Sequence, residues 1–207
     1  MRILLITVAL LTLASCGGKP EKGETDKSEA DKKENQTAEK QNYKLDAKSS
    51  TLKWKGSKSP SDGHNGSVQV TEGNIEMEGE KLISGDFIID MTTLVAEDTS
   101  LQADKIKMLT GHLKNEDFFF VEKNPSVSVK VNGYNEGKLS AIINILGKEI
   151  KQDLPVSLTK SENGVTINGK FSLDVSTLNM PGFKPHSPED QPILPTIDFD
   201  MNLVLNK

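Results

Sequence analysis

The chain has 207 residues, which is enough for one domain with an appendage. It carries 30 acidic residues against 25 basic ones, for a formal net charge of −5, and its single arginine is Arg2. A protein that binds nucleic acid needs a basic excess to meet phosphates and arginine forks to read bases, so this composition excludes nucleic acid as an expected partner.

Residues 1–15 have the pattern of a lipoprotein signal peptide. Arg2 supplies a positive end, and "ILLITVALLTLA" follows as an apolar run of twelve residues. A membrane-spanning helix needs about twenty apolar residues, so this run fits the core of a secretory signal instead. The run ends in "LASC", which resembles the lipobox of bacterial lipoproteins, where a peptidase cuts before the cysteine and the sulfur then carries a diacylglyceryl group.

Cys16 is the only cysteine, so no internal disulfide can form and lipidation accounts for the leftover thiol. An ordinary signal peptide with a chance cysteine is the alternative. Gly17 follows where an aspartate would resemble a signal for retention in the inner membrane. We therefore expect a lipid-anchored protein of the bacterial cell envelope, held at the outer membrane on its periplasmic face or at the cell surface.

Residues 16–41 are expected to form the lipidated cysteine and a disordered charged tether. After Cys16, this segment contains no aromatic and no branched aliphatic residue. It has nothing to bury and cannot offset the entropy of ordering its chain. A specific binding motif within it is the alternative.

Residues 42–207 are predicted to form one all-β domain. Apolar and polar residues alternate in "TLKWKG", "SVSVKV", "VTINGKFSLDV" and "TIDFDMNLVL". Such alternation indicates antiparallel strands with one face in water, and turn sequences such as "SENG" recur between them. Many short strands of this kind form either a sandwich or a closed barrel.

One segment departs from this pattern. "DTSLQADKIKMLTGHL" has apolar residues near helical spacing, and Thr99 with Gln102 predicts a capping box at its start. We expect a short helix that ends near Leu113. Phe118, Phe119 and Phe120 follow, and in an extended segment at least one of them must face away from the others. The alternative is that all three fill the core.

The sequence contains no motif that indicates an enzyme. A GxSxG elbow, an HExxH pair, a P-loop and a GxGxxG turn are all missing, so we expect no enzymatic activity and no cofactor. His64, His112 and His186 lack metal-ligand spacing, so no metal is expected. His64 is interpreted as holding a loop together, and His112 as packing at the end of the helix.

A proline-rich segment, "MPGFKPHSPEDQPILP", lies between the last two strand patterns and contains five prolines. Proline disrupts both helices and strand ladders, so we expect no regular structure there. A lid over a cavity and a rigid crossover loop are both consistent with this sequence.

"HLKNEDFFFVEKNP" resembles the "HL…dFFdvekyP" signature of the YceI-like family of polyisoprenoid-binding, lipocalin-like proteins. "WKGSK" with "HNGSVQVTEGNI", "ISGDFIIDMTTLVAED", "LGKEIKQDLPVSL" and "GKFSLDVSTLNM" resemble further family motifs in the same order. The resemblance covers residues 43–205. Phe120 stands where the family usually has aspartate, Val175 where arginine is common, and Val127 to Val131 replace a more aromatic strand.

The resemblance implies an eight-stranded antiparallel lipocalin-like barrel, with one inserted short helix, around a long apolar cavity. Relatives hold isoprenoids or similar long-chain lipids, so the expected function is binding, storage or transport of such a lipid. The alternative is a structural or stress-related envelope lipoprotein whose barrel is filled and whose outer surface is the working part.

The expected partners are a long-chain lipid and the membrane that holds the anchor, with a homodimer as a further candidate assembly. Because the chain has no second arginine, headgroup contacts fall to lysine, backbone or hydroxyl groups, and we expect weak discrimination between diphosphate and neutral headgroups. For the ligand-facing residues, plain core packing is the alternative to ligand contact. These residues are Trp54, Phe87, Ile89, Phe119, Phe171, Leu173, Phe199 and Met201.

The anchor can be tested by replacing Cys16, because the lipobox requires its sulfur. Cys16→Ser should leave the precursor uncleaved and unlabelled after growth with radioactive palmitate, whereas the parent chain should take up the label. If the parent chain takes up no palmitate, the lipoprotein interpretation is wrong.

Overall fold

The computed structural model describes residues 38–59, 62–185, 187 and 192–207. The predicted signal peptide, Cys16 and most of the predicted tether lie outside these residues, as does His186. Within the described part of the chain, no helix is both long and apolar enough to cross a membrane.

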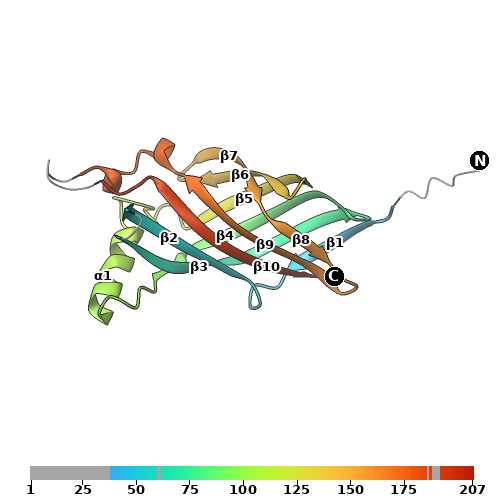
Figure 1. Cartoon of the computed structure of the whole chain (residues 1–207), viewed down its shortest axis with the longest axis horizontal. Helices are drawn as coiled ribbons and strands as arrows, with labels where there is room; N and C mark the ends of the chain where they lie inside the picture. The colour runs from blue at the N-terminus through green and yellow to red at the C-terminus, as the bar shows by residue number, and fades with distance from the viewer. Residues whose placement is uncertain (1–37, 60–61, 186, 188–191) are drawn as a thin grey trace, which may run out of the picture. The chain divides into compact units, whose positions relative to one another are not determined.

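In the described residues, one antiparallel sheet contains ten strands (Figure 1). The strands are β1 (Lys40–Leu45), β2 (Thr51–Ser59), β3 (Asp62–Glu78), β4 (Lys81–Ala96), β5 (Ser126–Asn135), β6 (Lys138–Ile145), β7 (Lys148–Pro155), β8 (Ser157–Lys160), β9 (Gly164–Asp174) and β10 (Thr196–Asn206). The helix α1 (Ala103–Lys114) follows β4, and the short 3-10 helices η1 (Ser176–Leu178) and η2 (Pro181–Phe183) follow β9. Since β1 begins at Lys40, the folded part starts two residues before the predicted boundary at 42.

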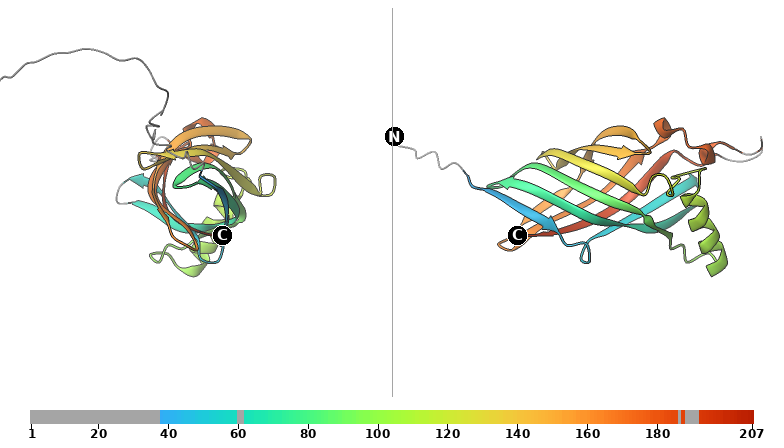
Figure 2. Two further views of the ribbon diagram at one scale, coloured as in Figure 1. Left: turned by 90° about the vertical axis from the view of Figure 1, so that its right-hand side faces the viewer. Right: turned by 180° about the vertical axis from the view of Figure 1, so that it is seen from behind.

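The ten strands occupy eight positions around the barrel. β1 and β2 both lie between β3 and β10: β1 pairs with the end of β3 and β2 with its beginning. β7 and β8 are likewise successive parts of one position, because β7 pairs with β6 and β8 pairs with β9. The predicted all-β barrel with one short helix is therefore confirmed, with two of its strands interrupted. Figure 2 shows the strands arranged around a common axis.

The barrel closes at a seam where β7 lies beside β9. No ladder pairs join these two strands within the described residues, because β8 takes the pairing edge of the first part of β9. Instead, the Gln152 side chain donates a hydrogen bond to the Ser172 carbonyl at 2.7 Å. The Lys148 ammonium donates to the Thr177 carbonyl at 2.8 Å. Side chains thus replace the backbone ladder along this part of the wall.

The two ends of the barrel are built differently (Figure 1). At one end, which we call the mouth, lie the end of β2, the start of β3, α1 and the described residues of the segment 175–195. At the other end lie the β3–β4 and β8–β9 turns, the start of β1 and the end of β10. The described chain therefore enters the barrel at the end opposite the mouth.

The helix α1 covers part of the mouth without burying any residue completely. Ile106, Leu109 and Leu113 are half-buried and pack against the core, at the spacing that predicted the helix. The predicted capping box is wrong. The helix begins at Ala103, and its N-cap residue Gln102 makes no side-chain hydrogen bond to the first turn.

A substitution at Gly73 tests how tightly the side chains of the barrel wall pack. Gly73 in β3 is the register partner of Phe87 in β4, and a Cβ added to it would overlap the Phe87 ring. Gly73→Ala should therefore displace the ring and lower the free energy of unfolding by about 1–3 kcal/mol in chemical denaturation. The matched control is Gly56→Ala, since a Cβ at Gly56 meets no atom within 4 Å. Its effect should stay within about 0.5 kcal/mol, and equal losses in the two variants would contradict this account.

Candidate functional site: an apolar cavity

A cavity of about 420 Å³ lies inside the barrel. This is within the range of about 300–1,000 Å³ that is usual for small-molecule sites. Its wall is formed mainly by aliphatic and aromatic side chains from β2 to β6, β9 and β10, together with α1 and the segment after β9. Val127, Val129 and Val131 of β5 are short and border the cavity, which leaves space along the axis. The interior is therefore not filled, which does not favour the alternative of a filled barrel.

The end of the barrel opposite the mouth is packed solid. Seven side chains there are at most 1% exposed, and none of them borders the cavity; they are Tyr43, Ile75, Met77, Leu82, Val165, Ile167 and Leu205. At the mouth, by contrast, exposed residues such as Lys58, Lys184 and Leu194 border the cavity. The cavity is therefore blind at one end and reaches the surface at the other.

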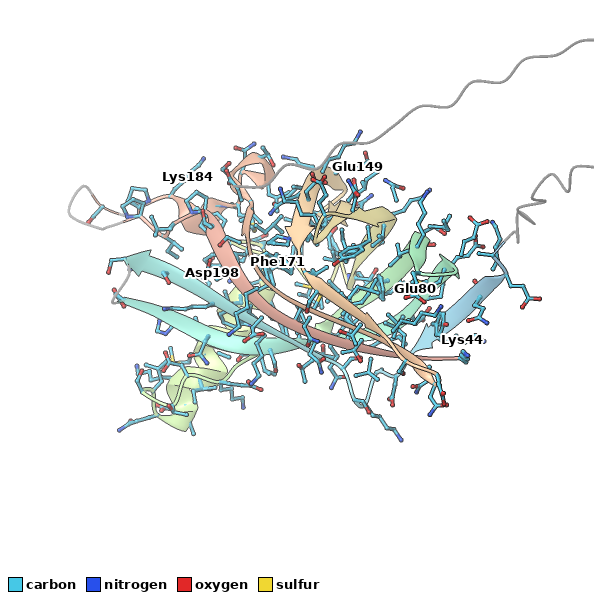
Figure 3. The ribbon with its side chains drawn as sticks, turned by 45° about the vertical axis from the view of Figure 1, so that its right-hand side comes forward. Lys44, Glu80, Glu149, Phe171, Lys184 and Asp198 are labelled. Carbon is cyan, nitrogen blue, oxygen red and sulfur yellow. The ribbon has the colours of Figure 1, made fainter. Side chains whose placement is uncertain are left out.

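All eight predicted ligand-facing residues border this cavity. They are Trp54, Phe87, Ile89, Phe119, Phe171, Leu173, Phe199 and Met201. Phe171 and Phe199 are register partners on β9 and β10, and their rings stack with centroids 5.5 Å apart. The indole N–H of Trp54 donates to the Ser67 carbonyl at 3.3 Å, so its polar atom is satisfied without a ligand. Figure 3 places Phe171 on β9 beside Asp198, which is exposed.

The three consecutive phenylalanines do not all face the cavity, because their segment is a turn and not an extended strand. Phe118 is buried and borders the cavity, and its ring packs edge-on against His112 and Phe183. Phe119 borders the cavity. Phe120 has a positive φ of 42°, and the Lys123 ammonium lies 4.6 Å from the centroid of its ring. The alternative in which all three fill the core is therefore wrong.

His64, at the start of β3, contacts the segment before α1. This agrees with the prediction that it holds local chain segments together. Its Nδ1 lies 2.8 Å from a carboxylate oxygen of Asp98, which is buried. The hydroxyl and the backbone N–H of Ser100 donate to the other oxygen at 2.6 and 2.9 Å. The Ser100 hydroxyl first, and then the His64 ring, lower the pKa of Asp98 from 3.8 to about 2, because both hydrogen bonds favour the ionised carboxylate.

His112 packs at the end of α1, also as predicted. Its ring contacts Phe118, and its Nε2 lies 3.1 Å from a carboxylate oxygen of Asp117. Among the described residues, no group of three or more His, Cys, Asp or Glu side chains is arranged to hold a metal ion.

The described residues of the segment after β9 form one side of the mouth. The prediction that it has no regular structure is wrong at Pro181–Phe183, where η2 starts with proline, a residue tolerated in a first helical turn. The Gly182 N–H donates to the Asp117 carbonyl at 2.8 Å, and the Leu194 N–H donates to the Ser57 carbonyl at 2.9 Å. Since the described parts are tied to two other elements, they favour a rigid crossover over a mobile lid.

Sequence reasoning missed the cavity residues that do not lie on strands. Leu109 and Leu113 reach the cavity from α1, and Lys184 and Ile193 from the crossover. The apolar spacing of α1 was a usable signal for its two leucines. The two crossover residues carry no periodicity, so only the folded chain places them at the mouth.

The family model described as the YceI-like domain matches residues 43–205. A search among curated proteins finds no match. Among solved structures, a polyisoprenoid binding domain from Saccharophagus degradans, implicated in plant cell wall breakdown, superposes with a TM-score of 0.56 at 14% identity, covering 79% of this chain and 97% of that one. BcnA from Burkholderia cenocepacia superposes with a TM-score of 0.58 at 16% identity, covering 77% of this chain and 98% of that one. At these identities, the two structures support the fold alone.

The His64–Asp98 contact predicts a specific dependence of stability on pH. The pKa of Asp98 is lower in the folded chain, at about 2, than its ordinary value of 3.8. Asp98 therefore stabilises the fold fully above pH 4 or so, and this contribution is lost as the pH falls toward about 2. The difference in free energy of unfolding between the parent chain and Asp98→Asn should be largest near neutral pH and shrink across that window. Ser100→Ala should reduce the difference, and a difference that stays constant down to pH 2 would refute the assignment.

Proposed function

Because the chain belongs to the YceI-like domain family, we propose that its barrel binds one long-chain lipid, of the isoprenoid or fatty acyl type, in the apolar cavity. The observation that carries this proposal is the blind cavity of about 420 Å³ with its aliphatic and aromatic wall. The polyisoprenoid binding described for the Saccharophagus degradans domain supports the same class of ligand.

The energetics of chain burial set the expected length of the ligand. Each buried methylene contributes about 0.8 kcal/mol, and association itself costs an estimated 4–15 kcal/mol. A chain of about six carbons therefore gains too little, whereas a chain of about fifteen carbons can bind usefully. Because one end of the cavity is closed by packed side chains, a longer chain must leave part of its length at the mouth, where each further carbon gains less.

The proposed setting is the bacterial envelope, with the barrel held at a membrane through a lipid on Cys16. The described chain enters the barrel at the end opposite the mouth, at Lys40 in β1. A tether joined there would leave the mouth free to exchange lipid, as storage or transport requires.

The cavity provides its own reporter for a binding test. Trp54 is the only tryptophan in the chain and borders the cavity. A bromine-labelled alcohol of about sixteen carbons should quench the fluorescence of Trp54 in the full chain carrying Cys16→Ser, purified without detergent and freed of lipid. A six-carbon analogue should give no quenching, and the affinity should rise with chain length and then level off.

A matched pair of variants separates the cavity from the outer surface. Val129→Phe adds a ring inside the cavity and should weaken binding at least tenfold, whereas Ser128→Phe adds the same ring on the exposed side of β5 and should not. If folded, lipid-free protein gives no quenching at any chain length, the proposed function is refuted. Equal loss in both variants would place the ligand outside the cavity.

A further inference from the structure

The titratable side chains of the described residues that border the cavity are all basic ones. Among the described residues that border it, the titratable side chains are Lys58, His64, His112 and Lys184, and none is an aspartate or a glutamate. This is unexpected for a chain with 30 acidic residues against 25 basic ones. The described border of the cavity is therefore basic in composition, although the whole chain carries a net negative charge.

The four groups do not have the same freedom to meet a ligand. Each histidine ring already contacts a carboxylate, His64 that of Asp98 and His112 that of Asp117. The side-chain ammonium groups of Lys58 and Lys184 form no ion pair or hydrogen bond with another described residue, and both lysines are exposed. Lys114, also at this end, is engaged, since its ammonium donates to the Thr92 carbonyl at 2.7 Å. Two ammonium groups are thus left to contact a ligand at the mouth.

The closed end of the cavity fixes which part of a ligand reaches these lysines. Seven fully packed side chains block the opposite end, so the polar end of a bound lipid must lie at the mouth. Lys58 comes from the end of β2, and Lys184 follows η2 on the crossover. Figure 3 shows Lys184 at the mouth end, away from Lys44 and Glu80. Lysine stems pack on apolar surface while their ammonium groups stay in water, which suits a position at the rim of a lipid cavity.

We propose that Lys58 and Lys184 make the mouth selective for a long-chain lipid with an anionic headgroup, either a carboxylate or a phosphate. This inference rests on the proposed binding of a lipid in the cavity. It revises the sequence-based expectation of weak discrimination between headgroups, which followed from the lack of arginine. Without arginine there is no bidentate fork, but two ammonium groups still attract an anion as point charges.

The preference should be moderate because the contacts are exposed. Exposed charge pairs are individually weak, so two of them predict roughly a five- to thirtyfold preference for the anion at low salt. The preference should shrink as salt is added, since the Debye length falls from about 10 Å at 0.1 M to about 3 Å at 1 M. A neutral headgroup of equal chain length should show no such dependence on salt.

The experiment compares three ligands that share a sixteen-carbon chain and differ in headgroup. Hexadecanoate, hexadecyl phosphate and hexadecanol compete at neutral pH with the bromine-labelled alcohol, and recovery of Trp54 fluorescence reports displacement. The two anions should displace the label at five- to thirtyfold lower concentration than the alcohol at low salt. The ranking of carboxylate against phosphate then identifies the headgroup chemistry that the mouth favours.

Lysine variants assign the effect to the mouth. In the double variant Lys58→Gln with Lys184→Gln, the ratio of anion affinity to alcohol affinity should fall to about one. In each single variant, this ratio should lie between that of the double variant and that of the parent chain. The control is Lys130→Gln, an exposed lysine of β5 that does not border the cavity, which should keep the parent ratio.

The outcomes separate the two proposals. If none of the three ligands displaces the label and the label itself does not bind, lipid binding is refuted. If hexadecanol and both anions bind equally to the parent chain, lipid binding stands and the headgroup inference is overturned. A preference that persists in the double variant would also overturn it, because the lysines would not be its source.

Discussion

The whole structure depends on how side-chain size is distributed along the inner face of the barrel. Burial of apolar side chains is the main force that holds the strands in a ring, and it requires an inner face without polar gaps. At the closed end, residues such as Tyr43, Met77 and Leu205 are fully buried in the core and do not border the cavity. Toward the mouth, the short valines of β5 leave the axis open. The same alternating pattern thus stabilises one end of the barrel and leaves a binding site at the other.

The mouth is held by a small aromatic cluster rather than by the sheet. The Phe118 ring packs edge-on against the Phe183 ring, and a Cβ at Gly182 would overlap the Phe118 ring. The turn after α1 is therefore closely packed against the crossover. The helix itself buries no residue completely. It is fastened by single contacts, such as the Ala96 N–H donating to the Thr110 hydroxyl at 3.0 Å.

The seam between β7 and β9 arises because one strand position of the barrel is divided between β7 and β8. β7 forms no ladder with β9 in the described residues; β8, which follows β7 after Val156, pairs with the first part of β9 instead. Val156 still donates its N–H to the Gly137 carbonyl at 2.8 Å, and its side chain is buried. The chain therefore passes from pairing with β6 to pairing with β9 while the Val156 side chain stays buried. Gly169 makes this change possible, since a Cβ there would lie 2.7 Å from a methyl group of Val156.

The sequence by itself determined which residues face inward, because strand alternation is a local property of the chain. It therefore predicted the all-β class and the seven strand residues that border the cavity, among them Trp54 and Phe199. The short helix was predicted from its own apolar spacing. Alternation could not predict where Phe118, Phe119 and Phe120 each point, since the turn that contains them has no period. The volume of the empty space, its closed end and the presence of both Lys58 and Lys184 at its border were decided only by the tertiary structure. The volume of a site and the charges around it depend on strands and loops that are far apart in sequence. No single stretch of the sequence therefore predicts them.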